Sequence, residues 1–261
     1  METDGESSAC VLSLDQLMSA ETKPVRIAAT ADIHYSKTGK GSLQELFSSA
    51  SHEADLLLLC GDLTDYGHAE EAAVLAEDLR AFVKIPVLAV LGNHDFETGH
   101  AEEIHNILCQ AGVTMLDGEC TEVKGIGFAG VCGFGGGFGR AMLNGWGEPA
   151  IKHFVQEAID QAMRLERALA RLETEKRVVL LHYAPIRDTV VGENPEIMPF
   201  LGSSRLEGPL NRFNVTAAFH GHAHGGAPEG KTGTGVPVYN VALPVLKKVD
   251  AAGRGYRVVE V

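Results

Sequence analysis

The stretch Ile85-Pro86-Val87-Leu88-Ala89-Val90-Leu91-Gly92-Asn93-His94-Asp95 sets the pattern on which the chain is built. Its first part, 85–91, is short, apolar and rich in branched residues, which predicts a buried strand. The chain then turns at Gly92 and presents an amide, an imidazole and a carboxylate in succession. Such residues after a strand usually make a turn or cap a helix, so this stretch alone assigns no chemistry.

The same pattern, an apolar strand that ends in polar side chains, occurs four more times. The strands are predicted at 25–30, 55–60, 177–181 and 215–219. The polar residues that follow them are Asp32 and His34, then Asp62 and Asp65, then His182, and finally His222 and His224. In open α/β sheets ligands bind at the carboxyl ends of the strands, so these side chains are expected to share one edge.

Helical spacing separates the strands in the first part of the chain. Helices are predicted at 42–53, 69–82, 101–110 and 149–176, and the tail from 236 to 261 is predicted as strands joined by turns. Strands that alternate with helices over the first hundred residues indicate right-handed crossovers and parallel pairing. Later strands lie closer together in the sequence and could pair antiparallel. The residues alone therefore predict an α/β fold.

The composition of the chain indicates which partners it binds and in which compartment it is expected. The net charge of −13 over 261 residues argues against a nucleic-acid-binding surface, because such proteins usually carry a basic face. It does not argue against a small anionic substrate, since bound metal ions reverse the local field. An odd count of five Cys without a CxxC motif predicts free thiols in a reducing compartment. No apolar run is long enough to cross a bilayer, and the polar, acidic N-terminus does not resemble a signal peptide. We therefore expect a cytoplasmic protein without membrane attachment, in an oligomeric state that the sequence leaves open.

The chain is expected to form one domain from 25 to 261 after an N-terminal extension, 1–24. The segment 186–212 has mixed composition with three prolines and is predicted to be a lid over the site. The glycine-rich segment 133–147 is either a loop over the site or a surface connection, and the sequence does not decide between these.

The side chains at the strand ends form a mixed set of oxygen and nitrogen donors without a thiolate. The set contains Asp32, His34, Asp62, Asn93, His182, His222 and His224. Such donors suit divalent manganese, iron or zinc. Seven groups are too many for one ion, whereas a shared carboxylate could bridge two ions about 4 Å apart, as in enzymes that catalyse displacement at phosphorus.

Five blocks in this order resemble the signature of the calcineurin-like metallophosphoesterases. The blocks are Asp32-x-His34, Gly61-Asp62-x-x-Asp65, Gly92-Asn93-His94-Asp95, His182, and Gly221-His222-x-His224. The resemblance implies a four-layer α/β/β/α sandwich with two mixed sheets. It also implies that a hydroxide between two metal ions attacks phosphorus in line.

The resemblance further implies a role for each site residue. One ion would be held by Asp32, His34, Asp62 and His224, and the other by Asp62, Asn93, His182 and His222. His94 would contact the phosphoryl group and act as general acid on the leaving oxygen. Asp65 would orient His94 through a hydrogen bond.

Two positions depart from the Ser/Thr phosphoprotein phosphatases of this superfamily. Tyr66 stands where those enzymes have a phosphate-gripping arginine, and Asp95 stands where they have glutamate. The chain is therefore expected to be closer to the bacterial branch that includes class III cyclic-nucleotide phosphodiesterases, and to hydrolyse a small phosphodiester such as a cyclic nucleotide. A phosphomonoesterase or nucleotidase is the alternative, and a non-catalytic metal-binding protein of the same fold is a third possibility.

Several other residues are candidates for substrate contact. Arg140, Arg187 and Arg205 could join Asn93 and His94 in binding a phosphate, because arginine suits phosphate, although each is more often a surface charge. Phe134 and Phe138 could stack on a base, but core packing is the more common role. His220 is expected to be a buried histidine with its hydrogen bonds satisfied.

Overall fold

The computed structural model describes residues 23–250 and 253–261, and the structural statements below concern this part of the chain. The first of its two sheets has the strand order β11-β1-β2-β3-β4. Its members are β1 (Arg26–Thr30), β2 (Leu56–Cys60), β3 (Val87–Val90), β4 (Val113–Met115) and β11 (Arg257–Glu260). Strands β1 to β4 run parallel, and β11 pairs antiparallel with β1, so the sheet is mixed.

The second sheet has the strand order β5-β6-β7-β8-β10-β9. Its members are β5 (Glu119–Val123), β6 (Ile126–Val131), β7 (Lys176–Leu181), β8 (Ala217–His220), β9 (Glu229–Lys231) and β10 (Pro237–Asn240). The four central strands are parallel, and β5 and β9 are antiparallel edges. This sheet is therefore also mixed.

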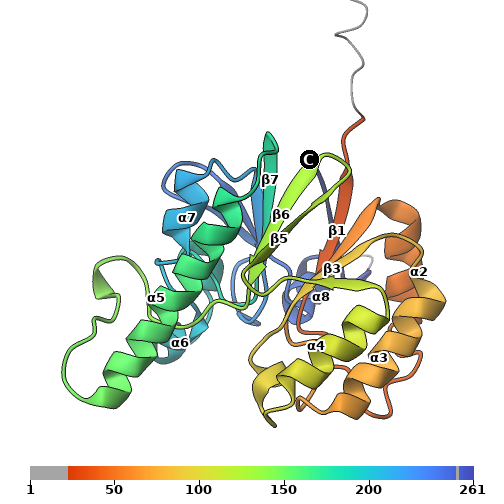
Figure 1. Cartoon of the computed structure of the whole chain (residues 1–261), viewed down its shortest axis with the longest axis horizontal. Coiled ribbons are helices and arrows are strands. Elements are labelled where there is room, and N and C mark those ends of the chain that lie inside the picture. Colours follow the sequence, from red (N-terminus) through yellow and green to blue (C-terminus); the bar gives the residue numbers. More distant parts are fainter. Residues whose placement is uncertain (1–22, 251–252) are drawn as a thin grey trace, which may run out of the picture.

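Helices cover the outer face of each sheet, which makes four layers (Figure 1). The helices α2 (Gln44–Glu53), α3 (Ala69–Phe82) and α4 (Ala101–Gln110) pack on the first sheet. The second sheet is covered by α5 (Pro149–Ala170) and α7 (Glu207–Arg212). The predicted α/β/β/α sandwich with two mixed sheets is confirmed.

Strand β2 shows why two sheets can pack face to face. All five of its residues are buried. Because side chains alternate along a strand, Leu57 and Leu59 face the helices. Leu56, Leu58 and Cys60 face the other sheet, where they meet residues of β6, β7 and β8. A strand that is buried on both faces reads as a continuous apolar run, which is the pattern seen in the sequence.

The segment predicted to be a lid consists of short elements. They are η3 (Asp188–Val190), η4 (Pro195–Ile197), α6 (Met198–Leu201) and α7, and η2 (Gly139–Ala141) lies in the glycine-rich segment. The two segments touch, because Gly136 N donates to Pro199 O and Gly137 N donates to Gly202 O. The glycine-rich segment therefore packs against the segment 186–212.

Two predictions of secondary structure were wrong. Helix α5 ends at Ala170 rather than near 176, because Lys176 and Arg177 pair with β6 as part of β7. The tail contains the helix α8 (Leu243–Val249), where only strands and turns were predicted. Pro244 occupies its first turn, where a helix needs no proline N–H, so the proline starts a helix instead of a turn.

The structure can also be compared with the predictions that the cysteines are free thiols and that the chain does not cross a bilayer. Within the described residues Cys60, Cys109, Cys120 and Cys132 are free thiols, as predicted. Cys10 and nearly all of the predicted extension 1–24 lie outside those residues. Among the helices that the structure describes, none has the length and hydropathy to cross a bilayer.

Candidate active site

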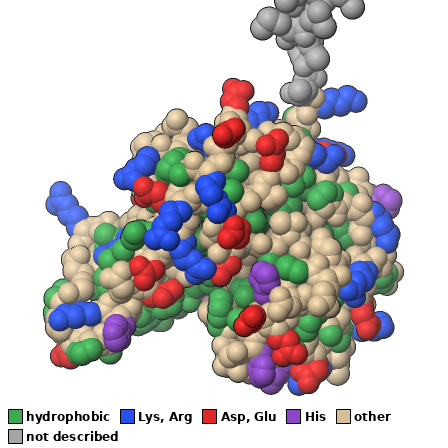
Figure 2. All heavy atoms as spheres, viewed as in Figure 1, with side chains coloured by type: hydrophobic (Ala, Val, Ile, Leu, Met, Phe, Trp, Pro, Cys, Tyr) green, Lys and Arg blue, Asp and Glu red, His purple; other side chains and the backbone are tan. Residues whose placement is uncertain are grey.

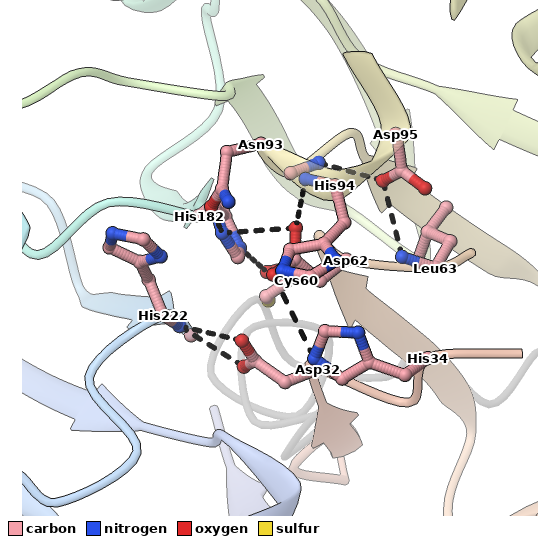
Figure 3. A network of polar contacts seen from close by, with 12 residues as sticks. Asp32, His34, Cys60, Asp62, Leu63, Asn93, His94, Asp95, His182 and His222 are labelled. Carbon is pink, nitrogen blue, oxygen red and sulfur yellow. Dashed lines mark hydrogen bonds and ion pairs between the residues drawn. The ribbon is translucent and has the colours of Figure 1, made fainter. Parts of the chain in front are cut away.

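The five polar blocks come together where strands of both sheets end. Asp32 and His34 follow β1, Asp62 and Asp65 follow β2, and Asn93 and His94 follow β3. His182 follows β7, while His222 and His224 follow β8. The loops of the two sheets face each other across this edge, so residues as far apart as Asp32 and His222 lie side by side (Figure 3).

The donor groups gather into overlapping clusters. Asp32, His34 and His224 can each offer one ligand atom, and these atoms all lie within 4.8 Å of one another. The same holds for Asp62, His182 and His222. A third cluster joins His34 to Asp65 and His94. The predicted donors are therefore close enough together to share cations.

Asp62 lies between the first two clusters. Its Oδ1 is 3.3 Å from His182 Nε2, and its Oδ2 is 3.9 Å from His34 Nε2. The side chain is almost fully buried and its Oδ1 accepts a 2.9 Å hydrogen bond from His94 N. The carboxylate thus presents one oxygen to each cluster, as a bridging ligand would.

The surroundings of His182 indicate that a cation belongs here. Its Nδ1 lies 3.0 Å from the main-chain oxygen of Cys60, which can only accept, so Nδ1 carries the proton in the neutral ring. The lone pair of Nε2 then faces Asn93 Oδ1 at 2.9 Å as well as Asp62 Oδ1. His182 and Asp62 are buried and Asn93 is half-buried, so the three acceptors repel one another in a place with little water, and a bound cation satisfies all three. The buried His34 Nδ1 also lacks a hydrogen-bond partner in the described structure.

The carboxylate of Asp32 is held by the backbone of the loop that follows β8. Asp32 accepts from His222 N at 3.0 and 3.1 Å and contacts His224 Nε2 at 2.8 Å. Burial opposes ionisation, but the hydrogen bond to His224, the nearby His182 ring and the His222 amide together lower the pKa of Asp32. Asp32 is therefore an anion at neutral pH, ready to bind a cation.

The histidine rings of the last block differ in their surroundings. Burial, more than any other effect, lowers the pKa of His222 to about 3, so its ring is neutral. Its Nε2 donates to the Phe200 carbonyl at 3.2 Å, which leaves Nδ1 as the atom that can bind a metal. The hydrogen bond with Asp32 instead raises the pKa of His224. Phe200 belongs to α6, so the segment 186–212 touches the site through this carbonyl.

His94 is half-buried beside the clusters, and its ring lies 4.6 Å from that of His34. Its Nδ1 lies 2.6 Å from the main-chain oxygen of Asp65 and must donate to it, which leaves Nε2 free to act on a ligand. Burial lowers the pKa of His94, but the Asp65 carbonyl and the nearby carboxylates outweigh it, and the net shift is upward. The Asp65 carboxylate does not make this bond; its Oδ1 lies 3.7 Å from His34 Nδ1.

The backbone at the site is unusual. Asp32, His34, Asp62 and His222 have φ values of 55°, 43°, 48° and 67°. Residues other than glycine avoid this left-handed region, and such outliers gather at functional sites. Glycines allow the loops to approach: a Cβ on Gly92 would lie 2.2 Å from Asp62 N, and one on Gly221 would lie 2.4 Å from Asp32 Oδ2.

None of the three arginines proposed for substrate contact belongs to the clusters that the described residues form. Arg140 and Arg187 line a groove of about 430 Å³ that contains none of the candidate metal ligands. Arg205 donates to the Leu143 carbonyl at 2.8 Å, which ties the segment 186–212 to the glycine-rich segment. His220, as predicted, is buried and satisfied: its ring nitrogens lie 2.7 Å from Gly221 O and from Thr189 Oγ1.

Sequence reasoning did not find two groups beside the site. The Tyr183 ring packs on His222 with ring centroids 4.4 Å apart, and the Phe200 carbonyl accepts from His222 Nε2. The position of Tyr183 directly after His182 was an available signal for the first. No local pattern marks the second, because Phe200 reaches the site only through the packing of α6.

Comparison with known proteins agrees with this geometry. Residues 25–226 match the calcineurin-like phosphoesterase family. Among solved structures, a phosphopantetheinyl hydrolase from Mycobacterium tuberculosis is similar with a TM-score of 0.66 and 16% identity, covering 91% of this chain and 96% of that one. The protein TT1561 of Thermus thermophilus has a TM-score of 0.57 and 18% identity, covering 91% and 99%.

A putative 5′-nucleotidase from Staphylococcus aureus has a TM-score of 0.51 and 13% identity, covering 82% of this chain and 48% of that one. No curated protein sequence matches the chain. At these identities the solved structures establish the fold alone. The match over 25–226, with its five blocks gathered at one edge, shows that the chain belongs to the calcineurin-like phosphoesterase family and is a phosphoesterase.

Proposed function

We propose that this enzyme hydrolyses a small phosphodiester with the help of two divalent cations. The observation that carries the proposal is the position of Asp62, which presents one oxygen to His182 and the other to His34. Asp32, His34, Asp62 and His224 would hold one cation. Asp62, Asn93, His182 and His222 would hold the other. Manganese, iron and zinc all suit this mixture of oxygen and nitrogen donors.

Cations held by these groups would supply a nucleophile at neutral pH and would stabilise negative charge on the phosphoryl oxygens. His94 completes the reaction from the protein side. The Asp65 carbonyl holds its Nδ1–H, so Nε2 can carry the proton that the leaving oxygen needs.

The choice of a diester rests on the charges around the site. A monoester dianion is best bound by an arginine fork, but Tyr66 occupies the position where related phosphatases have arginine and is 56% exposed. Arg140 and Arg187 line a separate groove, and Arg205 donates through Nη2 to the Leu143 carbonyl while its Nη1 is buried without a hydrogen-bond partner in the described structure. A diester has one negative charge, so it needs less compensation than a monoester. A phosphomonoesterase or nucleotidase stays the alternative.

A small substrate is favoured over a nucleic acid. On the face seen in Figure 2, acidic side chains lie beside the basic ones. The net charge of −13 also opposes binding to a polyanion. The free thiols are in keeping with a cytoplasmic enzyme, which we propose on that ground.

The test is hydrolysis of bis-(p-nitrophenyl) phosphate and of p-nitrophenyl phosphate by chelator-treated protein, with and without added manganese. The expected result is turnover that depends on manganese and favours the diester. Preference for the monoester would overturn the choice of substrate. Full activity in both Asp62→Asn and His94→Ala would overturn the assignment of the site.

A further inference from the structure

A second cavity opens beside the metal-binding side chains. Its volume is about 220 Å³, and it is lined by Phe96, Phe134, Tyr183 and Cys132 together with Asn93, Gly133, Glu157 and Gln161. Three aromatic rings therefore contribute to its wall. Phe96 is 48% exposed, so this ring stands at the opening of the cavity to solvent.

The cavity adjoins the candidate active site. Asn93 belongs to both, and its Oδ1 lies 2.9 Å from His182 Nε2. Tyr183 joins them from the other side, with its ring centroid 5.5 Å from that of His182 and 4.4 Å from that of His222. The Cys132 carbonyl accepts from both His182 N and Tyr183 N, which fixes the cavity wall to the site. A group attached to phosphorus at the site can therefore enter the cavity.

The residues that line the cavity carry a negative charge and no positive charge. Glu157 is the only charged residue among the described residues that line the cavity, which include no lysine, arginine or histidine. Gln161 Nε2 donates to Glu157 Oε1 at 2.9 Å, and Gln161 Oε1 accepts from Gly133 N at 3.2 Å. Glu157 is an exposed residue, so its carboxylate lies at the solvent side of the cavity. The cavity is thus lined by a carboxylate and three aromatic residues, which are groups that attract a cation.

The size of the cavity limits what it can hold. Pockets that enclose a whole drug-sized ligand have volumes of roughly 300–1,000 Å³. At about 220 Å³ this one suits a compact group and excludes a whole nucleotide. Rings that surround a small space beside a carboxylate are the arrangement that recognises quaternary ammonium groups.

We propose that the cavity is a specificity subsite for an alkylammonium group of the substrate, so that the enzyme acts on a phosphodiester with a cationic alcohol on one side. This inference rests on the proposed function for its link to catalysis, but the binding of the cation itself does not require metal. Phe134 and Glu157 are its specificity-determining residues. Phe134 supplies a ring that also packs on Tyr183 with centroids 5.8 Å apart, and Glu157 supplies the charge.

The first test measures binding to chelator-treated protein by nuclear magnetic resonance. The probes are choline and its uncharged isostere 3,3-dimethylbutan-1-ol. Choline is expected to bind more tightly than the alcohol. Phe134→Ala should weaken choline binding by about two- to thirtyfold, the range expected for loss of one cation–π contact. Glu157→Gln should weaken the binding of choline but not that of the alcohol.

Two further variants keep this test decisive. Trp146→Ala is the matched control, because Trp146 is a 69% exposed aromatic residue that does not line the cavity, and it should bind choline as the wild type does. If Phe134→Ala does not fold, Phe96→Ala replaces it, since that ring is half exposed. Equal binding of choline and the alcohol, or tighter binding of adenosine than of choline, would overturn the proposal.

The second test uses manganese-loaded enzyme with p-nitrophenyl phosphocholine and ethyl p-nitrophenyl phosphate. Phe134→Ala should raise KM for the choline ester several-fold more than it raises KM for the ethyl ester. Equal effects on the two esters would overturn the subsite. Choline binding in a protein that hydrolyses no phosphoester would instead overturn the proposed function and leave the binding site standing, so the two failures are distinguishable.

Discussion

Asp95 holds Thr64 through two hydrogen bonds to a single carboxylate oxygen. Oδ1 of Asp95 accepts from Thr64 N at 2.8 Å and from Thr64 Oγ1 at 2.6 Å, while Oδ2 accepts from Leu63 N at 3.1 Å and from Gly92 N at 2.8 Å. The side chain is fully buried. Asp95 therefore fastens the loop after β3 to the loop after β2, and those loops carry Asn93, His94 and Asp62.

The first prediction concerns this clamp. Asp95→Ala leaves four buried donors without an acceptor, and each unpaired donor costs about 1–3 kcal/mol. We expect the free energy of unfolding to fall by at least about 4 kcal/mol in urea titrations. Thr64→Val, which removes only the hydroxyl bond, should cost about 1 kcal/mol. Similar losses in the two variants would contradict the clamp.

The second prediction separates acid catalysis by His94 from its other contacts. His94→Ala should lower kcat by about 100- to 10,000-fold for a diester with an alkoxide leaving group, because the leaving oxygen then lacks its proton donor. The loss should be much smaller when p-nitrophenolate leaves, since that group departs without a proton. Equal losses for both leaving groups would show that His94 is not the acid.

Asp65→Ala is the matched comparison for His94. The bond to His94 Nδ1 comes from the main-chain oxygen of Asp65, so the variant retains it. Activity should therefore fall less than in His94→Ala, and the ratio of the two leaving groups should stay as in the wild type. A leaving-group ratio that matches His94→Ala would mean that the Asp65 side chain orients the acid after all.

The third prediction concerns removal of metal. Cations that bind only the folded chain stabilise it by about 2.7 kcal/mol at a hundredfold excess over Kd. Chelation should therefore abolish hydrolysis and lower Tm by about 5–10 °C for a chain of this size. Calorimetry of Asp62→Asn should show a much smaller shift between chelated and manganese-loaded protein. A Tm shift as large as that of the wild type would mean that Asp62 is not a metal ligand.

The fourth prediction uses two glycines that differ in what surrounds them. A Cβ on Gly221 would lie 2.4 Å from Asp32 Oδ2, whereas one on Gly208 would meet no atom within 4 Å. Gly221→Ala should displace the Asp32 carboxylate and reduce manganese affinity, measured by calorimetric titration, at least tenfold. Gly208→Ala should bind manganese as the wild type does. Equal affinity in both variants would mean that Asp32 is not a ligand.

The fifth prediction is a pH dependence of stability. Tyr35 is buried and its hydroxyl donates to the Asp78 carboxylate, and burial together with this bond raises the pKa of Tyr35 in the folded chain. The unfolded chain then loses this proton first, so the stabilisation is complete below about pH 10 and is lost as the pH rises further. The difference in unfolding free energy between the wild type and Tyr35→Phe should shrink above pH 10. A difference that is constant with pH would contradict the shift.

The sequence predicted the parts of this site that depend on local pattern. Each polar block follows an apolar run, and strand ends in an α/β sheet meet at one edge. The convergence of the blocks could therefore be predicted from the sequence alone. The second sheet came only from the family resemblance. Helix α8 was missed because Pro244 is compatible with both a turn and the first turn of a helix.

Other features depend on distances that no sequence period encodes. Whether Asp65 meets His94 through its carboxylate or its carbonyl is decided by the path of one loop. The cavity beside the site brings Phe96 and Phe134 to Glu157 on α5, and only the packing of that helix over the second sheet puts them together. The aromatic residues were visible in the sequence, but their common cavity was not.

The left-handed backbone at Asp32, His34, Asp62 and His222 has a consequence for directed evolution of this enzyme. Each such residue costs the folded chain roughly 1–2 kcal/mol that glycine would avoid. These are four of the positions that the proposed chemistry needs. A selection for heat resistance alone would find some of its largest single gains there, and every gain would remove a candidate ligand. Stability and activity are therefore opposed at the same four residues, so a selection for thermostable variants of this enzyme has to score turnover as well.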